Sequence, residues 1–136
     1  MGLDASLSRI EFKVKNDSEY YKIRNKKWKE CNEDYQKFEK WESSVRDEIL
    51  YTSNWQIAKL INQRNIGDKE VDFEDARDLV LDKEDIQIIL QSMKSARQDD
   101  EYENVYEELD QHIEELIKCL ETTDFKEETL LYGEWF

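Results

Sequence analysis

The chain has 136 residues, which is the length of one ordinary domain and enough to bury a core without disulfides or metals. Charged residues make up 40% of it, but 4 Trp, 7 Tyr and 5 Phe are more aromatic residues than disordered chains carry. No apolar run approaches the roughly 18 residues of a membrane span. We therefore expect one folded domain over residues 1–136 that neither spans nor binds a membrane.

The net charge of −14 is concentrated in the second half of the chain. Residues 1–68 contain 13 basic and 12 acidic side chains, whereas residues 69–136 contain 7 basic and 22 acidic ones. A surface this acidic repels nucleic acids and anionic membranes and attracts basic protein surfaces. The distribution predicts a protein partner and no direct binding to nucleic acid.

The N-terminal 14 residues lack the basic and apolar segments of a secretory signal, so we expect a cytoplasmic protein. In that compartment Cys31 and Cys119 would be reduced thiols in the core rather than a disulfide.

The first predicted element is a strand within residues 3–14, because apolar side chains at Ile10, Phe12 and Val14 alternate with charged ones. A long helical pattern follows over residues 28–49, with a break expected near Ser43 and Ser44. The apolar face of this helix would hold Trp28, Cys31, Tyr35, Phe38, Val45 and Ile49.

A shorter helix is predicted after Ser53, which would act as the N-cap with Gln56 three residues on. Its apolar face starts at Ile57, and residues 65–68 would end it, with Gly67 in a left-handed cap. The apolar run 79–81 predicts a short strand.

Another helix is predicted to begin at residues 82–85, where acidic side chains suit the positive end of the helix dipole. A further amphipathic helix is predicted over residues 105–120. Residues 129–136 read as a final strand, which we expect to pair with the N-terminal strand.

These elements predict an α+β fold, in which a small antiparallel sheet containing both termini packs against about four helices. The residues expected in the core are Phe12, Trp28, Phe38, Ile57, Leu60, Ile61, Ile86, Ile89, Leu90, Leu109, Leu116, Leu120 and Tyr132.

Catalytic chemistry is poorly supported by the sequence. His112 is the only histidine, and Cys119 lies seven residues further along the same predicted helix, roughly 10 Å away along its axis. That separation is too large for a hydrogen bond, so His112 is expected to be a half-buried structural residue. One histidine and two cysteines are too few ligands for zinc, and residues 99–110 lack the glycine and the final glutamate of a calcium loop. We expect no enzyme, no metal and no cofactor.

The acidic segment over residues 98–128 is the strongest local feature, with 13 acidic residues opposed by Lys118 and Lys126. Like charges at helical spacing repel each other and lower stability by a few tenths of a kcal/mol per pair. A row of carboxylates could imitate the phosphates of a duplex and bind a basic groove; the alternative is a surface that only keeps the protein soluble. The candidate partner-binding residues are Asp99, Asp100, Glu101, Glu103, Glu107, Glu108, Asp110, Glu114 and Glu115.

Three short motifs occur in order along the chain: the opening residues 1–4 (Met-Gly-Leu-Asp), the helix start at residues 81–86 (Leu-Asp-Lys-Glu-Asp-Ile) and the aromatic end at residues 132–136 (Tyr-Gly-Glu-Trp-Phe). In these the chain resembles a group of small phage and prophage proteins that open with Met-Gly-Leu-Asp and end in an aromatic Tyr-x-x-Trp strand. It departs from them at residues 51–54, where they often carry Tyr-Trp-Arg-Lys. The resemblance implies a phage or mobile-element origin and no particular activity.

Three functions remain open on these observations. The first is a phage-type protein that binds and inhibits a host protein in the host cytoplasm through the acidic segment. The second is a protein that binds and sequesters a small molecule or nucleotide with its aromatic residues and the basic cluster at residues 22–29. The third is a structural protein whose basic and acidic halves drive homo-oligomer formation.

Overall fold

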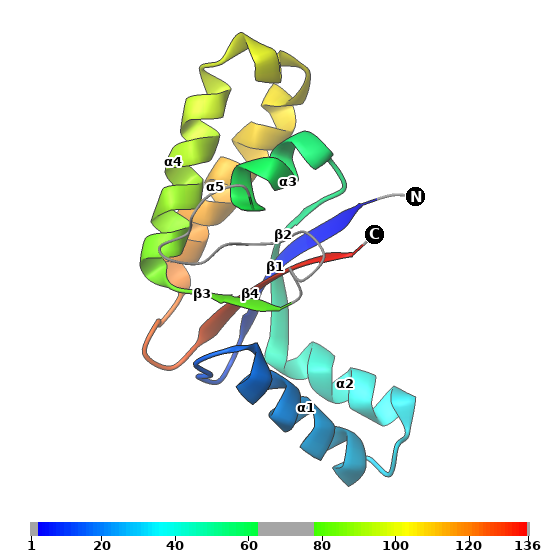
Figure 1. Ribbon diagram of the computed structural model, residues 1–136. Coiled ribbons are helices and arrows are strands. Elements are labelled where there is room, and N and C mark those ends of the chain that lie inside the picture. The colour runs from blue at the N-terminus through cyan, green and yellow to red at the C-terminus, as the bar shows by residue number, and fades with distance from the viewer. Residues whose placement is uncertain (1–2, 63–77, 136) are drawn as a thin grey trace.

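The computed structural model describes residues 3–62 and 78–135 (Figure 1). The helix end predicted at residues 65–68 therefore lies outside the described residues. No helix in the described parts of the chain is long and apolar enough to cross a membrane.

Within residues 3–62 and 78–135, four antiparallel strands form one sheet in the order β2-β1-β4-β3. The strands are β1 (Asp4–Ile10), β2 (Arg46–Thr52), β3 (Leu79–Leu81) and β4 (Thr129–Trp135). The N-terminal strand β1 is central and pairs with the C-terminal strand β4 along its whole length. The predicted α+β fold, with both termini in an antiparallel sheet, is confirmed.

The helices form two groups that pack on opposite faces of this sheet (Figure 1). They are α1 (Asp17–Glu30), α2 (Tyr35–Val45), α3 (Trp55–Asn62), α4 (Lys83–Arg97) and α5 (Tyr106–Thr122), with a 3-10 helix, η1 (Asp100–Val105), between the last two. Helices α3, α4 and α5 pack on one face of the sheet, whereas α1 and α2 pack against the lower part of the opposite face.

Successive side chains of a strand point to opposite faces of the sheet, so the apolar core has one part on each face. On the α3–α5 face, Leu7 of β1 and Tyr132 of β4 join the main apolar cluster with residues such as Ile57, Ile86 and Leu116. On the opposite face, a small cluster joins Ile10, Val14, Leu131 and Tyr20 of α1. Beyond this small cluster, the same face carries Ser6, Ser8 and Gly133, together with the indole of Trp135.

Most of the predicted core is confirmed as buried. Those residues are Phe38, Ile57, Ile61, Ile86, Ile89, Leu90, Leu109, Leu116 and Tyr132. Phe12, Trp28, Leu60 and Leu120 are half-buried instead. The first, third and fourth of these pack against the apolar clusters, whereas Trp28 packs edge-on against Phe38.

The predicted helix over residues 28–49 is wrong in its bounds. Helix α1 begins earlier, because the Asn16 side chain caps it, and the chain turns at Asn32 and Glu33, which have φ angles of 55° and 59°. Asp34 then caps α2 by accepting hydrogen bonds from two backbone amides. Residues 46–52, including Ile49, form strand β2 because they pair with β1.

Two other boundaries differ from prediction by less. Strand β1 ends at Ile10 rather than Val14, because the chain leaves the sheet to enter α1. The cap of α3 is Asn54 rather than Ser53, and Asn54 Oδ1 accepts from the Gln56 amide at 2.8 Å. The helix start at residues 82–85 is confirmed, and Asp82 and Asp85 form a reciprocal capping box.

Candidate functional site

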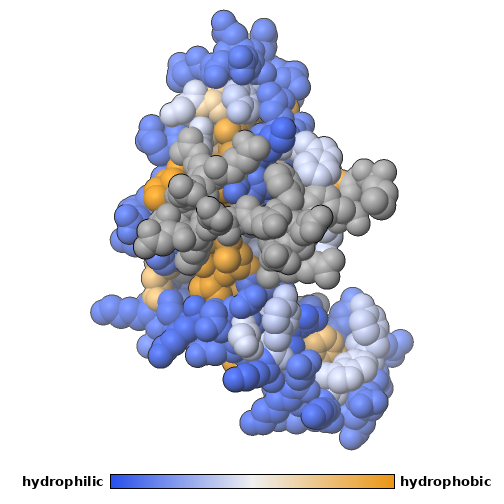
Figure 2. All heavy atoms as spheres, viewed as in Figure 1, coloured by the Kyte–Doolittle hydropathy of each residue, from blue (hydrophilic) through white to orange (hydrophobic). Residues whose placement is uncertain are grey.

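Seven of the nine predicted carboxylates gather on one exposed surface. It lies at the end of the molecule opposite α1 and α2, and this end is hydrophilic in Figure 2. We call this surface the acidic ridge. It consists of Asp99, Asp100, Glu101, Glu103, Glu107, Asp110 and Glu114, all exposed, from η1, its N-cap Asp99 and the first half of α5.

Buried apolar residues and an ion pair hold the acidic ridge in place. Val105 and Leu109, which lie between its carboxylates in the sequence, are buried in the main core. Arg97 of α4 binds Asp110 at 2.8 Å and stacks over the Tyr106 ring at 4.2 Å. The ridge is therefore held on two packed helices, although its charges remain in solvent.

Glu108 and Glu115 turn away from the ridge toward His112. Their carboxylate oxygens lie 2.8 and 2.7 Å from the two ring nitrogens of His112, which is only 1% exposed. Thr52 of β2 also donates to Glu108, at 2.6 Å. The His112 ring therefore bridges two glutamates of its own helix, α5, and one of them, Glu108, connects this helix to strand β2. This role is structural, as predicted, although the ring is buried and not half-buried.

The two cysteines are free, with Cys119 buried and Cys31 partly exposed. Burial raises the pKa of the Cys119 thiol, which opposes the thiolate that a nucleophile needs. The thiol instead contacts the Thr123 hydroxyl at 3.5 Å. Among the described residues, no group of His, Cys, Asp and Glu is arranged to hold a metal ion.

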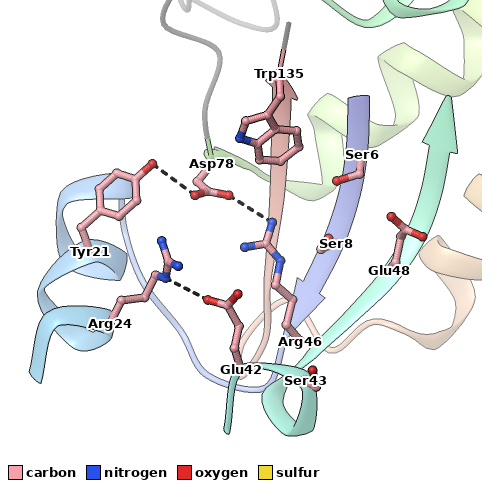
Figure 3. A pocket seen from close by; sticks show the side chains of 10 residues that line it. All are labelled: Ser6, Ser8, Tyr21, Arg24, Glu42, Ser43, Arg46, Glu48, Asp78 and Trp135. Atoms are coloured by element: carbon pink, nitrogen blue, oxygen red, sulfur yellow. Dashed lines mark hydrogen bonds and ion pairs between the residues drawn. The ribbon is translucent and has the colours of Figure 1, made fainter. Parts of the chain in front are cut away.

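A second candidate site, which sequence reasoning missed, is a polar cavity of about 680 Å³ on the sheet face opposite α3–α5. We call it the sheet-face pocket (Figure 3). Its floor is the sheet and its wall is formed by α1 and α2. It is lined by Ser6, Ser8, Tyr21, Arg24, Glu42, Ser43, Arg46, Glu48, Asp78 and Trp135.

Small side chains keep the floor of the sheet-face pocket open. Ser6 of β1 lies opposite Gly133 of β4 in the sheet, and Ser8 is the next residue on the same face. A Cβ atom at Gly133 would lie 2.7 Å from the Trp135 ring, so the glycine allows this indole to lie across the sheet. Larger residues at these positions would fill the cavity.

Asp78 organises one side of the pocket. It accepts hydrogen bonds from Tyr21 at 3.1 Å and from Arg46 at 3.0 Å, and Arg46 also donates to Tyr20 at 3.1 Å. Burial, followed by the Asp78 charge, raises the pKa of Tyr21 to about 12, so this hydroxyl remains a donor at neutral pH. Asp78 has a φ of 53°, a left-handed conformation that non-glycine residues seldom adopt outside special sites.

Arg24 of α1 approaches the pocket from the other side. Its Nε lies 2.8 Å from Glu42 of α2, an ion pair without good hydrogen-bond alignment. Its two terminal nitrogens point into the cavity (Figure 3) and make no hydrogen bond to a described residue. Of the predicted basic cluster, Lys22, Lys26 and Lys29 are exposed and Lys27 pairs with Glu30.

Comparison with protein-family models, curated proteins and solved structures finds no match to this chain. The resemblance to small phage proteins therefore stays a prediction that rests on the three motifs.

Proposed function

We propose that this chain is a non-enzymatic, phage-type protein that binds a basic surface of a host protein through the acidic ridge and thereby inhibits it in the host cytoplasm. The observation that carries the proposal is the gathering of seven exposed carboxylates on η1, its N-cap and the first half of α5, which pack on the main core through Val105 and Leu109. Among the described residues, Arg97 is the basic side chain that forms an ion pair with one of them.

The cost of this arrangement supports a selected role. Glu107, Asp110 and Glu114 lie three and four residues apart on α5, so their charges repel across neighbouring turns. A basic partner would relieve that repulsion and would be attracted from a distance at low salt. A surface needed only for solubility does not require the charges to be concentrated at one end.

The spacing indicates how closely the ridge could imitate nucleic acid. At 1.5 Å per residue, the exposed acidic residues of α5 are about 4.5–6 Å apart along the helix axis. Duplex DNA carries a charge about every 1.7 Å. The carboxylates of η1 add to the row without reaching that density. The proposed partner is therefore a protein with a basic surface, such as one that binds nucleic acid, recognised by charge rather than by a faithful copy of a duplex.

The test neutralises four ridge carboxylates together, in the variant Asp100→Asn, Glu103→Gln, Glu107→Gln and Glu114→Gln. We expect the tagged wild type to retain a salt-sensitive partner from host lysate, and the variant to bind that purified partner about a hundredfold more weakly. Asp110 is left intact so that its contact with Arg97 is preserved.

The matched control removes four exposed carboxylates elsewhere, Glu11, Glu39, Glu121 and Glu127, each replaced by Gln. It has the same net charge as the ridge variant, and we expect it to bind within about threefold of the wild type. Equal weakening of both variants would show that net charge, and not the ridge, attracts the partner. Wild-type binding by the ridge variant would exclude the ridge.

A further inference from the structure

The sheet-face pocket plays no part in binding through the acidic ridge. It is formed by β1, β2, β4, α1 and α2, whereas the ridge is formed by η1 and α5. Its volume of about 680 Å³ is within the range of sites for small molecules, which is roughly 300–1,000 Å³. A cavity of this size with a polar lining can hold a ligand of nucleotide size.

Among the described residues, three kinds of groups that could contact a ligand face the cavity. The terminal nitrogens of Arg24 form a planar fork of the kind that binds phosphate or carboxylate oxygens in pairs. The hydroxyls of Ser6 and Ser8 make no hydrogen bond to a described residue and can donate or accept. Trp135 is 37% exposed, so part of its indole is available to stack on a flat ring.

We propose that the sheet-face pocket binds a nucleoside monophosphate. Arg24 binds the phosphate, the Ser6 and Ser8 hydroxyls contact the sugar, and the base stacks on Trp135. These are the groups that a ligand with an anionic end, a hydroxylated middle and a flat ring requires, and the pocket supplies one of each.

The charges of the pocket select a monophosphate over a polyphosphate. Arg46 is already neutralised by Asp78 and hydrogen-bonded to Tyr20, so it offers little to a ligand. The fork of Arg24 makes no hydrogen bond to a described residue, although Glu42 balances its charge. Glu48 is exposed at the rim and has no ion pair to a described residue, so it would repel additional phosphates.

The test is titration of the full chain with AMP, GMP, CMP and UMP, followed by calorimetry and by NMR shifts of the pocket residues. We expect at least one of the four to bind with a dissociation constant below about 1 mM. Adenosine and ribose 5-phosphate, which each lack one end of AMP, are expected to bind at least tenfold more weakly than the complete nucleotide. Equal binding by ribose 5-phosphate would overturn the stacking on Trp135.

Single substitutions test the two proposed contacts at the ends of the nucleotide. Arg24→Gln is expected to weaken binding at least tenfold and Trp135→Ala about tenfold, because each removes one end of the site. Lys22→Gln is the matched control, since it removes the same charge from an exposed position of the same helix outside the pocket, and binding should stay within twofold.

Glu48→Gln tests the sign of the ligand charge without touching the folded core. An anionic ligand should bind two- to threefold more tightly at low salt once this rim carboxylate is gone. Weaker nucleotide binding by this variant would show that Glu48 helps to hold the ligand instead of repelling phosphate, and it would overturn the assigned role of the pocket charges. Failure of all four nucleotides to bind the wild type at 5 mM would overturn the proposal itself. The ridge variant should bind nucleotides normally, which separates this outcome from the test of the ridge.

Discussion

Replacing Arg46 with Met should lower the free energy of unfolding by about 3–5 kcal/mol. The Arg46 and Asp78 side chains are 16% and 7% exposed and lie 3.0 Å apart. Removing the guanidinium leaves a buried carboxylate with the Tyr21 hydroxyl as its remaining donor among the described residues, and it also takes a donor from Tyr20. Urea unfolding followed by circular dichroism measures the loss.

Two further variants test whether the loss of stability comes from the burial of the Arg46–Asp78 pair. Arg97→Met breaks the Arg97–Asp110 pair, whose side chains are 37% and 56% exposed, and should cost no more than about 1 kcal/mol. Adding Asp78→Asn to Arg46→Met removes the uncompensated charge and should recover most of the stability, since asparagine tolerates the left-handed backbone at this position. Similar losses in the two arginine variants would contradict the argument.

Replacing Glu134 with Gln should stabilise the protein at neutral pH by about 1–2 kcal/mol. Glu134 is 1% exposed, and one of its carboxylate oxygens has no hydrogen-bond partner. The other oxygen accepts from Tyr132 and Asn62, both at 2.5 Å. Burial outweighs these two donors and raises the pKa of the Glu134 carboxyl.

Because folding raises the pKa of the Glu134 carboxyl, the stability of the wild type relative to Glu134→Gln should fall as the pH rises. A carboxyl whose pKa is raised by folding contributes its full stability below its unfolded value of about 4.3 and loses it as the pH rises through the folded value. The wild type should therefore approach Glu134→Gln in stability near pH 4 and fall behind it as the pH rises, after which the gap becomes constant. Thermal unfolding from pH 4 to pH 8 measures this gap.

The exposed Glu127→Gln serves as the control and should leave the pH profile unchanged. A Glu134→Gln variant that is less stable than the wild type from pH 5 to pH 8 would show that Tyr132 and Asn62 stabilise the charged carboxylate and that burial does not dominate.

Elements defined by local chemistry could be predicted from the sequence. The start of α4 depends on Asp82 and Asp85, which are three residues apart, and the buried faces of α4 and α5 repeat with the helical period. The final strand was also predictable, because its apolar and aromatic residues are consecutive. Local signals of this kind do not depend on the rest of the chain.

Strand β2 was missed because its signal is not local. Val45 and Ile49 have the spacing of a helix, and the strand becomes stable only through its pairing with β1, about 40 residues away. The alternation within residues 46–52 is also weak, since most of this edge strand is only partly buried. Pairing overrode the helical pattern.

The two candidate sites also differ in whether the sequence alone could predict them. The acidic ridge could be predicted from the sequence, because its carboxylates are close in sequence on consecutive helical turns. That Glu108 and Glu115 contact His112 instead of joining the ridge depends on the packing of α5. The sheet-face pocket could not be predicted, because it exists only in the folded chain. Ser6, Arg24, Arg46, Asp78 and Trp135 come from five distant segments, and strand pairing and helix packing bring them to one cavity.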